Sequence, residues 1–166
     1  MANRIHKISA TDFPTDAASL SVTLDGSNNY YFIARNVAGN STGTLEMRLN
    51  VAGSPITNST YDSYMRVGTS STNFVDEHNT DEASVKIQYN ALNTNSDNNF
   101  WGMIFAANEA DATYFFVKGS GSQGSTLYNT LVGGRLNENS IVNGFQILTS
   151  GATNFAQGKL IVYGMN

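Results

Sequence analysis

Apolar and polar residues alternate along much of the chain. Between residues 45 and 51, Leu, Met, Leu and Val occupy every second position, and Glu, Arg and Asn occupy the positions between them. Residues 20–24 and 85–89 repeat this period of two. Because successive side chains of a β-strand point to opposite faces, the alternation predicts strands that bury one face and expose the other to water.

Other apolar runs complete a set of about ten short predicted strands. These are residues 20–24, 30–34, 45–51, 61–67, 85–89, 100–106, 113–118, 126–132, 141–149 and 159–163. The run from Phe100 to Ala106 is nearly all apolar, which predicts a central strand covered on both faces, with Trp101 in the core. The last strand is apolar on both faces too, so we expect it inside its sheet or beneath a subunit partner.

Turn-forming residues separate the predicted strands. Segments 25–29 and 36–43 are rich in Gly, Asn and Ser, and Gly133-Gly134 follows the strand at 126–132. Only residues 76–84 could hold a short helix, and that segment has no apolar face. The pattern therefore favours an all-β fold: an antiparallel, jelly-roll-like β-sandwich of about 8–10 strands.

A single β-sandwich domain over residues 16–166 accounts for this pattern. A chain of 166 residues suits one core, and neither an internal repeat nor a linker divides it. Residues 1–15 are the least patterned, and we expect an N-terminal arm there that orders on a neighbouring subunit. Near the other end, we expect Phe155 to plug one end of the sandwich and Gly158 to let the chain turn into the last strand.

The composition supports strands over helices. Hydrophobic residues make up 40% of the chain and aromatic residues 11%, which is enough apolar surface for a core. Charged residues make up only 13%, against about 25% in typical soluble domains. Their place is taken by 21 Asn, 17 Ser and 16 Thr. These residues have poor helix propensity and favour turns and strand ends.

The charge distribution argues against two classes of partner. The net charge is −4 and the pI is about 4.9, and no two Lys or Arg residues are adjacent. Binding to nucleic acid or to an anionic membrane needs clustered cations, so we expect neither. The N-terminal segment lacks the apolar region of a secretory signal, and the chain has no cysteine for disulfides or thiolate zinc sites.

Candidate metal-binding groups are few. His6 lies in the expected arm, and His78 lies within the acidic stretch 76–82. Carboxylates and an imidazole can bind a metal ion, but the spacing matches neither an EF-hand nor a two-histidine zinc motif. We interpret this stretch as a solvated acidic segment. Segment 93–99 has one carboxylate, and we interpret it as a polar turn in preference to a calcium loop.

Sequence signatures of catalysis are weak. Residues 119–124 have the glycine spacing of a dinucleotide-binding loop, but they follow a strand and no helix is expected after them to receive a phosphate. No Gly-x-Ser-x-Gly motif occurs, and no pair of carboxylates stands out for glycoside hydrolysis. We therefore expect a non-enzymatic protein without catalytic, cofactor or metal sites, with a hydrolase as the weaker alternative.

Several short motifs point to a known group of proteins. Gly134-Arg135-Leu136-Asn137 precedes the segment 141–147, and the final strand is entered through Phe155-Ala156-Gln157-Gly158 and ends in Tyr163-Gly164. Earlier, the Tyr-rich segment 30–34 is followed by Leu45-Glu46-Met47-Arg48-Leu49-Asn50. Over residues 20–166 this combination resembles small β-sandwich structural virion proteins of tailed bacteriophages.

The resemblance implies a structural role in a phage virion, as a capsid decoration (cement) protein or as a tail or fibre component. Such proteins act through protein–protein contacts, so we expect a homo-oligomer, preferably a trimer, and partners such as a major capsid or tail protein. The expected location is the virion, after synthesis in the bacterial host cytoplasm. No catalytic residue belongs to the motifs, so none is assigned.

A carbohydrate-binding, lectin-like module, or a fibre tip that binds a host receptor, is the alternative. Exposed aromatic side chains stack on sugar rings in such modules, and Tyr61 and Tyr64 flank a predicted strand where either could be exposed. Which residues would bind a ligand is unknown from the sequence.

Overall fold

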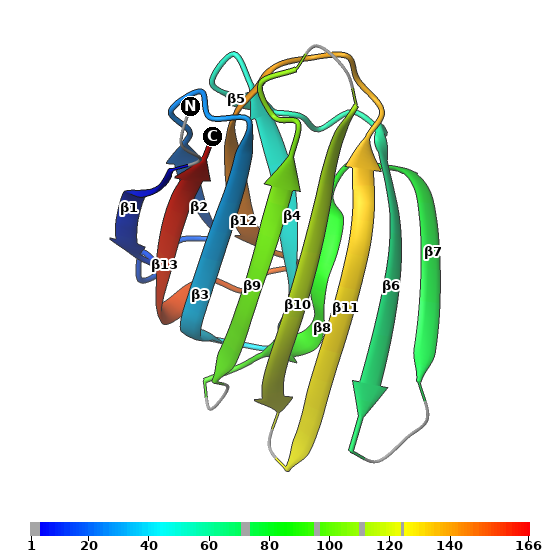
Figure 1. Cartoon of the computed structure of the whole chain (residues 1–166). Coiled ribbons are helices and arrows are strands. Elements are labelled where there is room, and N and C mark those ends of the chain that lie inside the picture. The colour runs from blue at the N-terminus through cyan, green and yellow to red at the C-terminus, as the bar shows by residue number, and fades with distance from the viewer. Residues whose placement is uncertain (1–3, 71–73, 95–96, 110–111, 124) are drawn as a thin grey trace.

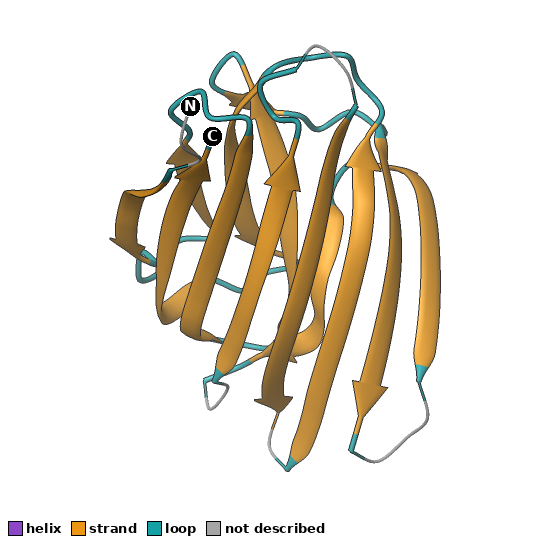
Figure 2. Cartoon of the chain, viewed as in Figure 1, coloured by secondary structure: helices purple, strands orange, loops and turns teal. Residues whose placement is uncertain are grey.

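The protein is an antiparallel β-sandwich. The computed structural model describes residues 4–70, 74–94, 97–109, 112–123 and 125–166. These residues form thirteen strands and no helix (Figure 2). The strands are β1 (Ile5–Asp12), β2 (Ser19–Thr23), β3 (Asn29–Gly39), β4 (Gly43–Val51), β5 (Ser54–Pro55), β6 (Tyr61–Thr69), β7 (Val75–Glu82), β8 (Val85–Leu92), β9 (Asn98–Phe105), β10 (Thr113–Gln123), β11 (Thr126–Leu136), β12 (Val142–Thr149) and β13 (Phe155–Met165).

Two sheets of unequal size make the sandwich. The large sheet has eight strands in the order β1-β13-β3-β9-β10-β11-β6-β7. The small sheet has the order β2-β12-β4-β5, and β8 pairs with β4. Figure 1 looks onto the outer face of the large sheet, with the small sheet behind it. Most neighbours are distant in sequence, so the chain crosses repeatedly between the layers.

The predicted strands are confirmed, and several are longer than the apolar pattern suggested. β3 continues to Gly39, through residues expected to form a turn. Asn36 adopts a left-handed φ of 53°, and the pairing of β3 with β9 shifts register between Ala34 and Val37. The chain therefore accommodates its polar residues in a β-bulge and continues the strand.

The prediction that residues 76–84 could hold a helix is wrong. Residues 75–82 form β7, which pairs with β6 at one edge of the large sheet. An edge strand needs no apolar face, and charged side chains on it discourage pairing with other chains. The acidic stretch 76–82, interpreted from the sequence as a solvated segment, belongs to such an edge.

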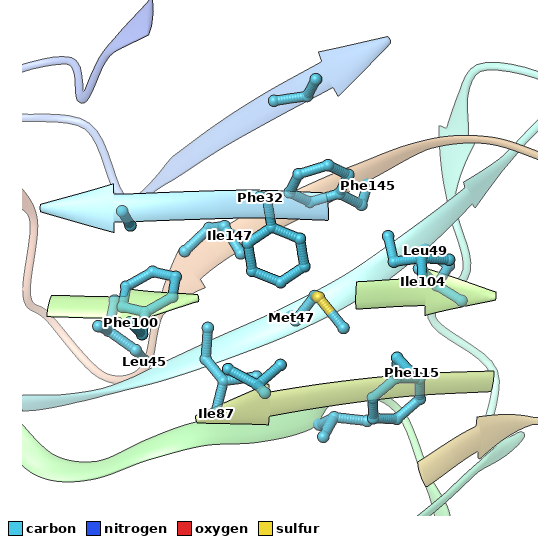
Figure 3. Close-up of a cluster of buried hydrophobic side chains, with 14 of the residues drawn as sticks. Phe32, Leu45, Met47, Leu49, Ile87, Phe100, Ile104, Phe115, Phe145 and Ile147 are labelled. Carbon is cyan, nitrogen blue, oxygen red and sulfur yellow. The ribbon is translucent and has the colours of Figure 1, made fainter. Parts of the chain in front are cut away.

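Side chains from both sheets interdigitate in one core. Phe32 on β3 and Phe145 on β12 are completely buried, and their ring centroids lie 5.2 Å apart. Met47 on β4 and Ile104 on β9 extend the contact between the layers (Figure 3). Alternate residues of β9 and β12 therefore supply the two halves of the core, as the period of two predicts.

The end of the chain is built partly as expected. Phe155 is fully buried and packs against Phe13, with ring centroids 4.6 Å apart. Gly158 has a φ of 139°, a conformation that other residues rarely adopt, and β13 shifts register beside it. Phe155 is therefore buried as predicted, whereas Gly158 lies inside β13 and accommodates an irregularity of that strand, not the turn that leads into it.

The N-terminal segment lies on its own chain. Residues 5–12 form β1, which pairs with β13 at the edge of the large sheet opposite β7. Nε2 of His6 lies 2.5 Å from Oδ2 of Asp25, which ties this edge strand to the turn after β2. Exchange of this strand with a neighbouring subunit stays a prediction.

Candidate functional site

Partly exposed apolar side chains lie on one half of the outer face of the large sheet. We call this set the apolar band. Its members lie on four neighbouring strands, β13, β3, β9 and β10: Tyr31, Ile33, Trp101, Met103, Phe105, Phe116, Ile161, Tyr163 and Met165. A soluble monomer rarely exposes a contiguous apolar patch larger than a few hundred Å². The band is therefore the first candidate for a contact surface.

Aromatic rings organise the centre of the apolar band. The ring centroid of Trp101 lies 6.0 Å from that of Tyr31 and 5.5 Å from that of Phe116. Tyr31 in turn lies 6.2 Å from Tyr163. These distances are typical of attractive aromatic pairs, so the rings form an ordered surface.

The expectation that Trp101 lies in the core is wrong. β9 is central in the large sheet as predicted, but Phe100 and Ile104 point inward while Trp101 and Met103 point outward. The segment is apolar at nearly every position, so alternation could not tell which of its two faces meets the small sheet.

A hollow in the same outer face lies beside the apolar band, on β10, β11, β6 and β7. We call it the Gly133 hollow. Its volume is about 370 Å³, near the lower end of the range for small-molecule sites. Its lining includes Asp62, Tyr64, His78, Tyr114, Gly133 and Arg135.

Strand register explains the shape of the Gly133 hollow. Gly133 on β11 lies opposite Tyr64 on β6, and Arg135, two residues along, lies opposite Tyr114 on β10. A side chain at Gly133 would point outward, and a Cβ atom there would have no neighbour within 4 Å. Tyr64, 42% exposed, therefore lies directly across from the open floor on β6. Tyr114, 50% exposed, lies diagonally across from it on β10, two residues from Phe116, which is the direct partner of Gly133.

An ion pair between Arg66 and Asp76 lies beside Tyr64, at one side of the Gly133 hollow. Arg66 donates hydrogen bonds of 2.7 and 2.8 Å from Nε and Nη2 to the two carboxylate oxygens of Asp76. The hydrogen bond to Asp76 raises the pKa of the Tyr64 hydroxyl. The hydrogen bonds from Arg66 and Tyr64 lower the pKa of Asp76 to about 2. The Tyr64 hydroxyl thus interacts with a charged pair that is itself held by two hydrogen bonds.

A second polar cluster closes one end of the Gly133 hollow. Oδ2 of Asp62 accepts hydrogen bonds of 2.6 Å from Asn137 Nδ2 and of 3.1 and 3.2 Å from Arg135. Oδ1 of Asp62 accepts a hydrogen bond from the backbone N–H of Asp81. The bond from Asn137, with those from Arg135 and Asp81, lowers the pKa of Asp62. Asp62 is therefore an anion in a fixed orientation at neutral pH.

The two histidines lie far apart. His6 is on β1 and His78 on β7, at opposite edges of the large sheet. Within the acidic stretch, Asp76 pairs with Arg66, and Glu77 pairs with Lys86 at 3.2 Å. Because β7 is extended, these neighbouring carboxylates point to opposite faces. In the part of the chain that the structure describes, no three His, Asp or Glu side chains are grouped to hold a metal ion.

The segments 93–99 and 119–124, considered from the sequence as a calcium loop and a dinucleotide-binding loop, contribute residues to strands. Residues 95 and 96 of the segment 93–99 lie outside the described residues. Asn98 is buried and donates a 2.9 Å hydrogen bond to the backbone oxygen of Val37, so its side chain supports the fold. Residues 119–123 belong to β10, which pairs directly with β11. The glycine spacing there belongs to a hairpin, since the segment after it that the structure describes is a strand.

Sequence reasoning missed the floor of the Gly133 hollow. Gly133 and Gly134 were expected to end a strand, but they lie inside β11, which runs to Leu136. Two adjacent glycines within an extended segment signal a close approach of another group. Tyr64 was recognised as a candidate, whereas Tyr114 and Arg135 were not. Tyr61, by contrast, is 1% exposed, and its hydroxyl accepts a hydrogen bond from the backbone N–H of Leu49.

Acid should destabilise the protein through its paired aspartates. Burial raises the pKa of Asp25, but hydrogen bonds from His6 and Ser27 outweigh it and lower that pKa to about 2. The pKa values of Asp62 and Asp76 are lowered as well. Each group binds fewer protons in the folded than in the unfolded chain, so its contribution is complete above the unfolded pKa near 3.8 and is lost as pH falls toward 2.

We expect the urea midpoint to fall between about pH 5 and pH 2.5. The triple variant Asp25→Asn, Asp62→Asn, Asp76→Asn should be less stable at neutral pH and lose less of its remaining stability in acid. Equal acid losses for the two proteins would show that other groups control the transition.

Comparison with known protein families gave no match to this chain, and comparison with curated protein sequences gave none either. Among the described residues, no helix is long and apolar enough to cross a membrane. The apolar band and the Gly133 hollow, both on the large sheet, are therefore the features that bear on function.

Proposed function

We propose that this protein is a non-enzymatic structural protein that assembles through the apolar band. The observation that carries the proposal is the outward orientation of the aromatic and aliphatic side chains on β13, β3, β9 and β10, which the fold leaves partly exposed. Burial of such side chains against another protein is favourable in proportion to the apolar area removed from water.

A second copy of the chain is the occupant that the surface favours. The members of the apolar band carry no charge, so copies with a net charge of −4 can meet there without bringing like charges together. Tyr, Trp, Phe and Met are also the residue types enriched at the centres of protein interfaces. We favour a closed trimer, in which each copy contributes its band to a shared centre.

A phage virion is the assembly that we propose for this oligomer. The motifs at 134–137, 155–158 and 163–164 support this assignment through their resemblance to structural virion proteins of tailed phages. The role within the virion would be capsid decoration or a tail or fibre component. Mass spectrometry of purified phage particles tests it: the chain should be present in the particles, and its confinement to the lysate would contradict the assignment.

The oligomer is tested by replacing one aliphatic residue of the apolar band. The full chain should elute as an oligomer in size-exclusion chromatography with light scattering. Ile33→Lys should convert it to monomers at the same micromolar concentration, since a buried unpaired charge opposes association. Ile33 is partly exposed on the outer face, so the substituted ammonium group can reach water in the monomer and the fold should survive.

Ile141→Lys is the matched control. Ile141 is 51% exposed and lies outside the apolar band, before β12. It should leave the oligomer intact. A wild-type chain that is monomeric across the concentration range, or an oligomer that Ile33→Lys does not weaken, would refute assembly through the band.

A further inference from the structure

We propose that the Gly133 hollow binds a neutral saccharide, with one hexopyranose ring seated over Gly133 between Tyr64 and Tyr114. The hollow adjoins the apolar band on β10, where Phe116 pairs with Gly133, but its lining contains no member of the band, so this binding function is distinct from assembly. A fibre or decoration protein could use both surfaces at once.

The apolar part of the Gly133 hollow suits the faces of a sugar ring. A pyranose presents C–H groups on its faces and hydroxyl groups around its edge. Tyr64 and Tyr114 offer exposed aromatic rings on both sides of the floor, and Gly133 has no side chain to fill the space between them. Tyrosine provides an apolar face together with a polar hydroxyl, which is the combination that sugar recognition requires.

The polar part of the hollow suits hydroxyl groups. Asp62 and Arg135 lie at one end and His78 lies on the Tyr64 side, so both acceptors and donors line the space. Oδ2 of Asp62 is occupied by Asn137 and Arg135, whereas Oδ1 accepts a hydrogen bond from the backbone N–H of Asp81 and can accept another from a hydroxyl group. Sugar hydroxyls, which donate and accept, match such a rim.

The pairing of charges selects a neutral ligand. Arg135 is engaged by Asp62, and Arg66 is held in a two-point contact by Asp76. A phosphate, sulfate or uronic acid would meet these carboxylates and would have to displace one of them from its arginine. An uncharged hydroxyl-bearing ring can add hydrogen bonds without breaking either ion pair.

The site is ordered before any ligand arrives. Beside Tyr64, Asp76 holds Arg66 in a two-point contact, and Asp62 holds Arg135, so binding needs little rearrangement of these charged side chains. Preorganisation reduces the entropy lost on binding, which matters for a shallow site with few contacts.

A printed array of neutral glucose-, galactose- and mannose-containing oligosaccharides, with sialylated and uronic glycans on the same slide, tests the proposal. The full chain should bind a subset of the neutral glycans. In calorimetric titrations with the strongest of these, Tyr64→Ala and Tyr114→Ala should each weaken binding about tenfold or more. Gly133→Val should abolish binding by filling the floor.

Tyr31→Ala is the matched control, since it removes a tyrosine from the same outer face but outside the Gly133 hollow. It should leave glycan affinity unchanged, even where light scattering shows a weakened oligomer. Circular dichroism of each variant verifies that the fold is kept.

Three results would overturn the saccharide site: no wild-type signal on the array, a signal confined to acidic glycans, or binding that survives Gly133→Val. None of these results bears on assembly through the apolar band, which light scattering measures independently. Loss of the oligomer in Ile33→Lys with retained glycan binding would support both proposals.

Discussion

Replacing Phe145 by alanine is expected to lower the free energy of unfolding by about 3–5 kcal/mol. Phe145 is completely buried on β12 and pairs across the sandwich with Phe32, 5.2 Å away. Its strand neighbours Leu49 on β4 and Val22 on β2 are buried too. Because both sheets hold these side chains in place, the space left by the ring cannot close without moving a whole layer, and a cavity remains.

Urea denaturation followed by the fluorescence of the single tryptophan measures the loss. Phe74→Ala is the matched control, since this phenylalanine is 71% exposed and contacts Arg66 at the surface. The control should lose less than about 1 kcal/mol. If Phe145→Ala lost no more than Phe74→Ala, the packing of the two sheets through this ring would be wrong.

The second large effect concerns two adjacent glycines on β11. Gly134→Ala is expected to destabilise the protein by about 1–3 kcal/mol, the usual cost of overpacking. A Cβ atom at residue 134 would lie 2.4 Å from Cζ of Phe115 and 2.5 Å from the backbone oxygen of Asp62. Phe115 is 3% exposed, so its ring has no free space to enter, and the backbone of β6 is held by its pairing with β11.

Gly133→Ala provides the comparison within the same strand. A side chain at residue 133 would point to the opposite face of the sheet from one at residue 134. The methyl group added at residue 133 would have no neighbour within 4 Å. We expect a change within about 0.5 kcal/mol. Thermal unfolding should show a lowered Tm for Gly134→Ala only, by roughly 2–4 °C for each kcal/mol. Similar Tm values for the two variants would contradict the register of β11 against β6 and β10.

The positions of the strands were largely predictable, because alternating apolar and polar residues show which face of a strand is buried and which meets water. Segment 45–51 shows this, since Leu45, Met47 and Leu49 are buried as their alternation predicts. The failures occurred where that signal is missing. Residues 76–84 carry no apolar face, and an acidic edge strand and a solvated helix look alike when neither buries a side chain.

The candidate site was only partly predictable. The sequence indicates that Tyr64 could stack on a ligand, but its proposed role also depends on Gly133 and Tyr114. The pairing of β6 with β11, and of β11 with β10, brings these two residues near Tyr64. Register between strands so distant in sequence is chosen by core packing, and no local pattern encodes it.

The sequence by itself determined that this chain forms strands with one buried face, joined by Gly- and Asn-rich turns. Only the tertiary structure decided that Trp101 faces outward and that Tyr64 and Tyr114 flank an open glycine. The physical reason is that a strand apolar on both sides can bury either one. The small sheet packs on one face of the large sheet, and the side chains on the other face of each strand remain exposed.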